Sequence, residues 1–201
     1  MFRFFPVPLT YYALSESVRL GGVKRDWIRI DTLPRHVPAS LIASEDAGFC
    51  SHHGVEWGVL REVISNGATR GGSTISQQMI KNVFLWHGRS RFSRGVRKTL
   101  EIPMTLFVEV VYPKRRIAEI YLNVVEFDTG VFGIEEAAKH HFGVSANSLS
   151  QHQTALLIAV LPNPKSYTAV PASPYVSDRA KQIQKGARDV VARNLDDCIT
   201  K

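Results

Sequence analysis

The chain has 201 residues, 44% of them hydrophobic, which is enough to bury the core of one ordinary globular domain. Its 25 Lys and Arg residues outnumber its 18 Asp and Glu residues, and the net charge of +7 favours an anionic partner such as phosphate, a lipid surface or nucleic acid. Cys50 and Cys198 have neither CxxC nor CxxH spacing, so redox and zinc chemistry are not indicated, and a disulfide between them is the less favoured option.

The N-terminal stretch MFRFFPVPLTYYAL is apolar and aromatic, but it carries Arg3, Pro6 and Pro8. It is shorter than the ~20 residues that a bilayer span needs. It also lacks the small-residue cleavage site of a signal peptide. We therefore expect that the chain as given neither spans a membrane nor directs its own export.

Helical periodicity dominates from Pro38 onward, and no stretch alternates with period 2 between hairpin turns, so a mainly α fold is predicted. Two capping boxes mark helix starts, Thr74 with Gln77 and Ser150 with Gln153. The predicted helices are 38–45, 55–64, 75–83, 92–112 with a kink at Pro103, one opened by Pro113, one stopped by Gly143, one from 151 to just before Pro162, and 178–195.

A basic stretch at 81–98 contains no Asp or Glu. Its cations are Lys81, Arg89, Arg91, Arg94, Arg97 and Lys98, and Phe84, Trp86 and Phe92 lie between them. A solvated helix face with snorkelling side chains would explain this pattern, and so would nucleic-acid binding, although no nucleic-acid motif accompanies it. A lipid pyrophosphate fits both the charge and the apolar content. Ser73, Gln77 and Lys81 recur every four residues, which stacks them on one helix face.

Two carboxylates stand out, Glu45 at a predicted helix end and Glu101 beside the predicted kink. Glu45 and Asp46 point about 100° apart on a helix, so one would act and the other would support it. Glu101 lies four residues after Arg97 and three after Lys98, a spacing that also suits ordinary helix-surface ion pairs.

The histidines occur as two adjacent pairs, His52 with His53 and His140 with His141. We expect the members of each pair to point to opposite sides of the chain, unlike the i, i+4 spacing of a helical metal site. His52 is therefore interpreted as a hydrogen-bonding partner, and no metal site is predicted.

Five segments in order resemble the peptidoglycan glycosyltransferase family, the bacterial enzymes that polymerise lipid II into glycan strands. The first motif, EDxxFxxHxG, is met at Glu45, Asp46, Phe49, His52 and Gly54. The second, GGSTIxQQxxKN, is met at Gly71 to Ile75, Gln77, Gln78, Lys81 and Asn82. RKxxE appears as Arg97, Lys98 and Glu101, and KxxILExYLN appears from Lys114 to Asn123 with Ala118 where Leu is usual. The stretches EFDTGVFGIEEAAKHHFG and LLIAVLPNP are similar to the remaining blocks.

The resemblance implies a lysozyme-like fold, with a larger lobe, a smaller membrane-facing lobe and a cleft between them. It implies that residues 1–30 are a juxtamembrane segment and that residues 31–201 are the glycosyltransferase domain. Glu45 and Glu101 would be catalytic, Glu45 as the general base, and Asp46 and His52 would give structural support. The implied substrate-binding residues are Ser73, Gln77, Gln78, Lys81, Arg89, Arg97 and Lys98.

The implied partners are lipid II, the lipid-linked glycan strand and the membrane surface, with cell-division or elongation proteins as further candidates and no nucleic acid. No cofactor is required by the pattern, although Mg²⁺ or Mn²⁺ could share the pyrophosphate charge. The family acts on the outer, periplasmic face of the bacterial inner membrane, and its anchor helix is absent from this chain. The sequence has no SxxK or KTG element of a transpeptidase. The alternatives are a lysozyme-like lytic enzyme and a non-catalytic scaffold of cell-wall assembly.

Overall fold

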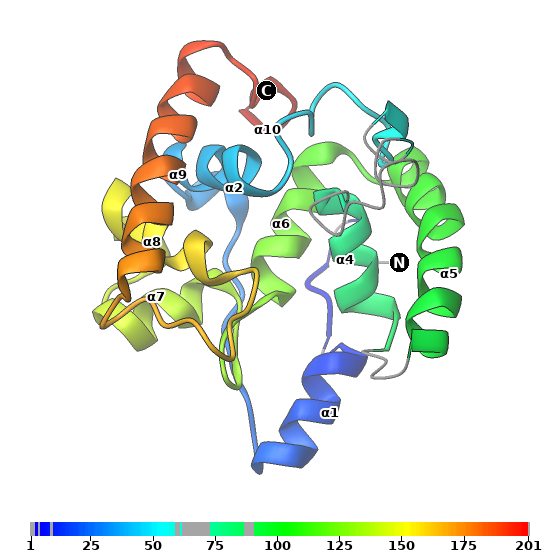
Figure 1. Cartoon of the computed structure of the whole chain (residues 1–201), viewed down its shortest axis with the longest axis horizontal. Helices are drawn as coiled ribbons and strands as arrows, with labels where there is room; N and C mark the ends of the chain where they lie inside the picture. The colour runs from blue at the N-terminus through cyan, green and yellow to red at the C-terminus, as the bar shows by residue number, and fades with distance from the viewer. Residues whose placement is uncertain are drawn as a thin grey trace.

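The computed structural model describes residues 3, 5–8, 10–58, 61, 73–86 and 91–200, and it confirms the mainly α prediction (Figure 1). The helices are α1 (Tyr11–Leu20), α2 (His36–Glu45), α4 (Ile75–Phe84), α5 (Arg91–Val111), α6 (Lys114–Val124), α7 (Ile134–Phe142), α8 (Gln151–Val160), α9 (Pro174–Ala192) and α10 (Asp197–Thr200). Half of the residues of the helix predicted at 55–64 lie outside the described residues.

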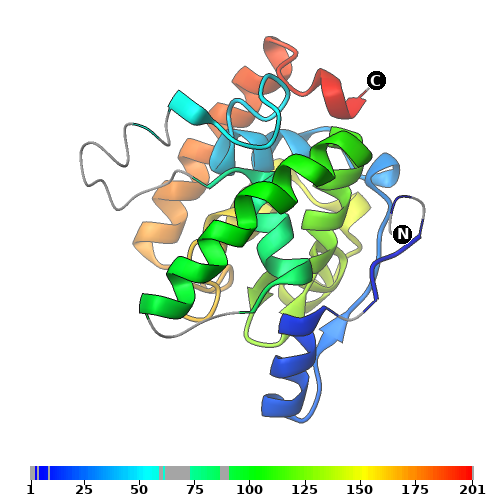
Figure 2. The same cartoon turned by 90° about the vertical axis from the view of Figure 1, so that its right-hand side faces the viewer.

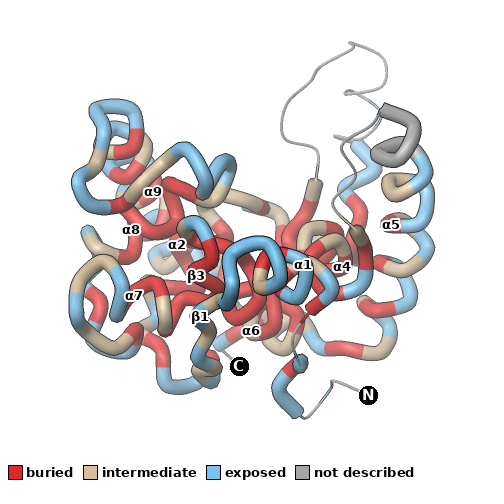
Figure 3. Tube along the Cα trace, turned by 90° about the horizontal axis from the view of Figure 1, so that it is seen from below, coloured by how far each residue is buried: buried red, intermediate tan, exposed pale blue. Residues whose placement is uncertain are grey.

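The helices pack as two neighbouring groups. α9 packs against both α2 and α8, while α4 packs between α5 and α6. Figure 2 shows α5 lying across the front of this second group. In Figure 3, buried residues run through α2, α8, α6 and α4. The apolar residues of α6 and α8, such as Tyr121 and Leu157, are completely buried, so these two helices form the centre of the core.

Both predicted capping boxes are confirmed. At α4 the Thr74 side chain accepts from the Gln77 N–H at 3.2 Å, and Gln77 Oε1 accepts from the Thr74 N–H at 3.1 Å. Ser150 and Gln153 make the same exchange at α8. Other boundaries moved: α2 begins two residues before Pro38, whose missing N–H is harmless in a first turn. α9 begins at Pro174 behind the Ser173 cap, four residues before the predicted start, and ends at Ala192.

A small sheet and the helix α1 were not predicted. β1 (Lys24–Arg25) pairs in parallel with β3 (Val131–Phe132), which pairs antiparallel with β2 (Glu126–Asp128). Strands of two or three residues are too short to show an alternating pattern. Because β1 joins this sheet, part of the first 30 residues packs onto the domain, and the predicted boundary at residue 30 stays a prediction. No described helix is both long and apolar enough to cross a bilayer.

The structure forms a disulfide between Cys50 and Cys198, the option that the sequence disfavoured. It joins the loop after α2 to α10, with Cα atoms 5.5 Å apart. The two cysteines are 148 residues apart, so only the packing of α10 near this loop brings them together. The disulfide thereby attaches the segment that carries Asp46 and His52 to the C-terminal end of the domain.

Candidate active site

Glu45 is the last residue of α2, and its carboxylate is held by three donors. Oε1 accepts from Ser44 Oγ at 2.9 Å and lies 3.4 Å from Nη2 of Arg179, a residue of α9. Oε2 accepts a hydrogen bond at 3.2 Å from Nε2 of Gln78, which belongs to α4. The side chain is 12% exposed, so the carboxylate is fixed in orientation while part of it remains accessible.

A second layer orients Gln78. The Tyr121 hydroxyl donates to Gln78 Oε1 at 2.9 Å, which fixes the amide so that its NH₂ group points at Glu45. Burial raises the pKa of Tyr121 well above its usual value, and the Glu45 charge adds to that shift. Tyr121 therefore stays protonated and remains a donor throughout the neutral range.

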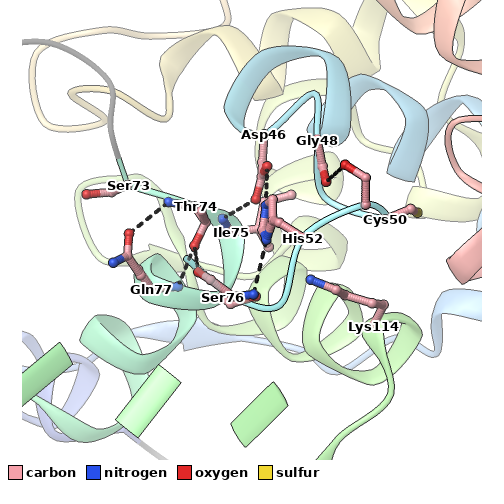
Figure 4. A network of polar contacts seen from close by, with 12 residues as sticks. Asp46, Gly48, Cys50, His52, Ser73, Thr74, Ile75, Ser76, Gln77 and Lys114 are labelled. Atoms are coloured by element: carbon pink, nitrogen blue, oxygen red, sulfur yellow. Dashed lines mark hydrogen bonds and ion pairs between the residues drawn. The ribbon is translucent and has the colours of Figure 1, made fainter. Parts of the chain in front are cut away.

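Asp46 and His52 connect the loop after Glu45 to the start of α4 (Figure 4). Asp46 Oδ2 accepts from the Ile75 N–H at 3.0 Å, and Asp46 Oδ1 lies 2.8 Å from His52 Nε2. The other ring nitrogen of His52 accepts from the Gly54 N–H at 3.1 Å. The structure thus places both predicted support residues where they fix the two elements that carry Glu45 and Gln78.

Gly54 ends this loop with a φ of +83°, a conformation that L side chains rarely adopt. A Cβ at this position would lie 2.6 Å from Glu109 Cγ and 2.7 Å from Thr105 Cγ2. The Glu109 carboxylate is held by Lys114 at 2.9 Å and by the Ser76 hydroxyl, so it cannot easily move away.

We therefore expect Gly54→Ala to lower the free energy of unfolding by about 2–4 kcal/mol, the combined cost of a left-handed backbone and an overpacked contact. Urea denaturation measures this change. Gly58→Ala is the matched control, because a Cβ at Gly58 meets nothing within 4 Å. Equal stability of the two variants would contradict the packing argument.

Several predicted anion-binding residues meet near the N-terminus of α4. Lys98 Nζ donates to Ser73 Oγ at 3.0 Å and lies 3.0 Å from Glu101 Oε2. Arg97 Nε lies 3.1 Å from the other Glu101 oxygen. The Glu101 side chain is only 4% exposed, so it acts here as the buried counter-charge of two cations. Arg89 lies outside the described residues.

Lys81 faces the same region one helical turn beyond Gln78. Burial lowers the pKa of its ammonium group, and the nearby charge of Arg97 lowers it further. The carboxylates of Glu101 and Glu45 oppose this shift. A bound anion would restore favourable interactions to this ammonium group.

Gln77 occupies a different place from the rest of the predicted face. Its side chain is buried in the α4 capping box, where Oε1 accepts from the Thr74 N–H. Its Nε2 has no hydrogen-bond partner among the described residues. The regular spacing with Ser73 and Lys81 therefore does not bring Gln77 to the wall of the cavity described next.

A cavity of about 710 Å³ brings these groups together. Ser73, Gln78 and Lys81 line one side, and Glu45 and Arg179 line another. A smaller cavity of about 230 Å³ shares Gln78 and Lys81 with it and extends toward α1. Glu101 is not among the described residues that line either cavity.

Two contributors to the site, Ser44 and Arg179, were missed by the sequence analysis. Arg179 donates to Ser44 Oγ at 3.0 Å, across 135 positions of sequence. It belongs to the helix predicted at 178–195, where nothing in the sequence singled out an arginine. Only the packing of α9 against α2 reveals that it reaches Glu45.

Among the described residues, the structure brings three potential metal ligands together at Asp128, His140 and His141, outside these cavities. In the part of the chain that the structure describes, Glu45 and Asp178 are the carboxylates that line the larger cavity. Two carboxylates are too few to fill the octahedral coordination of Mg²⁺. An Mg²⁺ ion there would take most of its ligands from a substrate's phosphates and from water.

The fold and the site are those of a helical enzyme domain. An oriented carboxylate, Glu45, lines the same cavity as the cations Lys81 and Arg179, which suit an anionic substrate. The transglycosylase family model matches residues 14–188, and the chain belongs to that family.

The chain is similar in sequence to proteins named biosynthetic peptidoglycan transglycosylase. The protein from Jannaschia sp. (strain CCS1) is 50% identical over 193 residues, which are 96% of this chain and 79% of the relative. Those from Caulobacter vibrioides and Rhodospirillum centenum are each 41% identical, covering 99% and 96% of this chain and 87% and 82% of the relatives.

Proposed function

We propose that this chain is a monofunctional peptidoglycan glycosyltransferase that polymerises lipid II into β-1,4-linked glycan strands. The donor would be the growing strand on undecaprenyl pyrophosphate, and the acceptor would be the GlcNAc 4-hydroxyl of lipid II. One observation carries the proposal: Glu45 is oriented at the wall of a cavity whose other side presents Lys81 and Ser73. Family membership and the names of the relatives support the same reaction.

In this reaction Glu45 is the general base. A sugar hydroxyl is a weak nucleophile at neutral pH, so a carboxylate must take its proton while the oxygen attacks C1 of the donor. The C1–pyrophosphate bond breaks as the new glycosidic bond forms on the opposite face, which inverts the anomeric configuration. Ser44 and Gln78 hold the carboxylate in place for this transfer.

The leaving pyrophosphate needs positive charge and hydrogen bonds more than it needs a proton. Lys81 lines the cavity, and Lys98 reaches it through Ser73. Glu101 holds Lys98 and Arg97 by ion pairs at 3.0 and 3.1 Å. We assign Glu101 a positioning role, because it contacts these cations and does not line the described cavity. A divalent cation would share the pyrophosphate charge as a substrate-bound ion.

The lowered pKa of Lys81 predicts a pH-dependent anion affinity. Lys81 loses its proton below the usual lysine value of 10.5, so pyrophosphate binding should weaken at least tenfold as pH rises through that lowered pKa. Because the unfolded chain holds this proton more tightly, folding stability should rise over the same interval. Calorimetric titration with inorganic pyrophosphate measures the affinity. Lys81→Arg keeps its charge and should give a flatter profile.

Lys185→Arg, at an exposed site on α9, is the control for this profile and should behave as the parent chain. An unchanged pH profile in Lys81→Arg would show that another group causes the dependence.

Incubation with lipid II tests the proposed function. Growth of glycan strands without cleavage of finished peptidoglycan supports the transferase. Fragmentation of finished glycan would instead identify the lytic alternative, and neither activity in a folded chain would favour the scaffold. Divalent metal and detergent should be varied in the same assay, since both affect access to a lipid-linked substrate.

We infer further that the chain acts in the cell envelope, on the outer face of the cytoplasmic membrane. α5 carries exposed apolar side chains at Leu100, Phe107 and Val110, and Phe84 at the end of α4 is 42% exposed. These side chains suit contact with a lipid surface, and the net charge of +7 favours anionic lipid. Division or elongation proteins remain candidate partners.

We expect sedimentation with anionic vesicles at low salt and at least a fivefold loss of binding in Phe107→Ser, which removes an apolar side chain that is 67% exposed. Ser148→Ala, on a short turn before α8, is the control. Equal sedimentation of the parent chain, Phe107→Ser and Ser148→Ala would show that α5 does not contribute to membrane binding.

A further inference from the structure

Three side chains with metal-ligating atoms converge where β2 ends and α7 ends. Asp128 is the last residue of β2, and His140 and His141 lie in the last turn of α7. One potential ligand atom from each residue lies within 4.8 Å of the other two. The expectation that the two histidines point to opposite sides is wrong, because helical neighbours diverge by about 100° and both can face one strand end.

The buried side chain of His141 has a ring nitrogen without a hydrogen-bond partner among the described residues. The side chain is 4% exposed, and the nitrogen in question is Nε2. Asp128 Oδ2 lies 3.4 Å from this nitrogen, but the pair does not have hydrogen-bond geometry. A buried polar atom without a partner is unfavourable, and a ligand between these two atoms would satisfy both.

The separation fits a metal ion. Two ligand atoms that each lie about 2.1 Å from a tetrahedral ion are about 3.4 Å apart, which matches the Asp128 to His141 distance. His140 is exposed, so its ring can turn to complete the set.

We propose that Asp128, His140 and His141 form a binding site for a divalent transition-metal ion of the zinc class, with water completing the coordination. Two imidazoles and one carboxylate select such ions over Mg²⁺, which prefers oxygen ligands. None of the three residues lines the described catalytic cavities, so the site is separate from any ion on the pyrophosphate. The bound ion would cross-link the end of β2 to the end of α7.

Titration of the untagged, chelator-treated chain with Co²⁺ tests the site directly. We expect one equivalent to bind with a Kd in the micromolar range, visible as d–d absorption that Zn²⁺ abolishes. His141→Gln, Asp128→Asn and His140→Ala should each weaken binding at least tenfold. The exposed His140→Ala variant removes a ligand without disturbing the core. His152→Gln, an exposed histidine on α8, is the control and should bind as the parent chain does.

A second readout is thermal unfolding. Zn²⁺ at about 100 times its Kd should raise the Tm of the parent chain by about 5–10 °C, and the rise should disappear in His140→Ala. Binding of equal strength in the parent chain and in all three ligand variants would overturn the proposal. So would the absence of any binding at 1:1 stoichiometry up to about 1 mM metal. Neither result would decide the proposed polymerisation of lipid II, because none of the three residues lines the cavities assigned to that reaction.

Discussion

Glu45→Gln is expected to lower the rate of lipid II polymerisation by about 10²–10⁴-fold, the usual contribution of a positioned general base. The amide has nearly the same size as the carboxylate and can still accept a hydrogen bond from Ser44. It cannot take a proton from the acceptor hydroxyl. The loss should therefore fall on the rate constant, while inorganic pyrophosphate still binds near Lys81 with affinity close to that of the parent chain.

Initial rates of strand growth from labelled lipid II measure this effect, and thermal unfolding checks the fold. Glu136→Gln is the matched control: it makes the same chemical change in the first turn of α7 at a residue that does not line the described cavities. Its rate should stay within about twofold of the parent chain. If the Glu45→Gln enzyme polymerises at the parental rate, the base assignment is wrong even though the family membership stands.

Removal of the disulfide in the double variant Cys50→Ala and Cys198→Ala is expected to lower the free energy of unfolding by about 3–5 kcal/mol. The bond closes a loop of 148 residues, and a long loop restricts the unfolded chain strongly. Domains of this kind have a total stability of about 5–15 kcal/mol, so the variant would retain only part of it. Urea denaturation under oxidising conditions measures the difference.

The same change should reduce activity before it unfolds the domain. Cys50 lies between Asp46 and His52, so the loop that orients the end of α2 loses one of its attachments. Dithiothreitol should lower the stability of the parent chain by a similar amount and leave the double variant unchanged. Equal stability of the oxidised parent chain and the double variant would show that the disulfide does not stabilise the fold.

Local chemistry explains which elements could be predicted. The helix starts at Thr74 and Ser150 were correct because a capping box is a contact between residues three apart. The predicted start of α9 was four residues too late, because α9 begins at Pro174. A proline is tolerated there, since the N–H that it lacks would have no helical partner in the first turn. The sheet was missed because β1 and β3 are about 107 residues apart and two residues long each.

The residues of the site also divide into those that local motifs identify and those whose role only the fold shows. Glu45, Gln78 and Lys81 could be selected from motifs whose residues stay together along the chain, and the structure brings them to one cavity. Gln77 has the spacing of a binding residue, but its side chain is used to begin the helix. Spacing alone cannot separate these two uses, because both place the residue near the N-terminus of α4.

The sequence by itself determined the helical class, the general base candidate and the family, because periodicity, caps and ordered motifs are local properties. The tertiary structure alone decided what long-range packing brings together. Arg179 reaches Glu45 across 134 positions, and Cys50 meets Cys198 across 148. Asp128 at the end of β2 lies 3.4 Å from His141 in the last turn of α7, although β3 lies between these two elements in the chain. Glu45 therefore could be found in the sequence, whereas the groups that orient it, stabilise its loop and bind a metal required the fold.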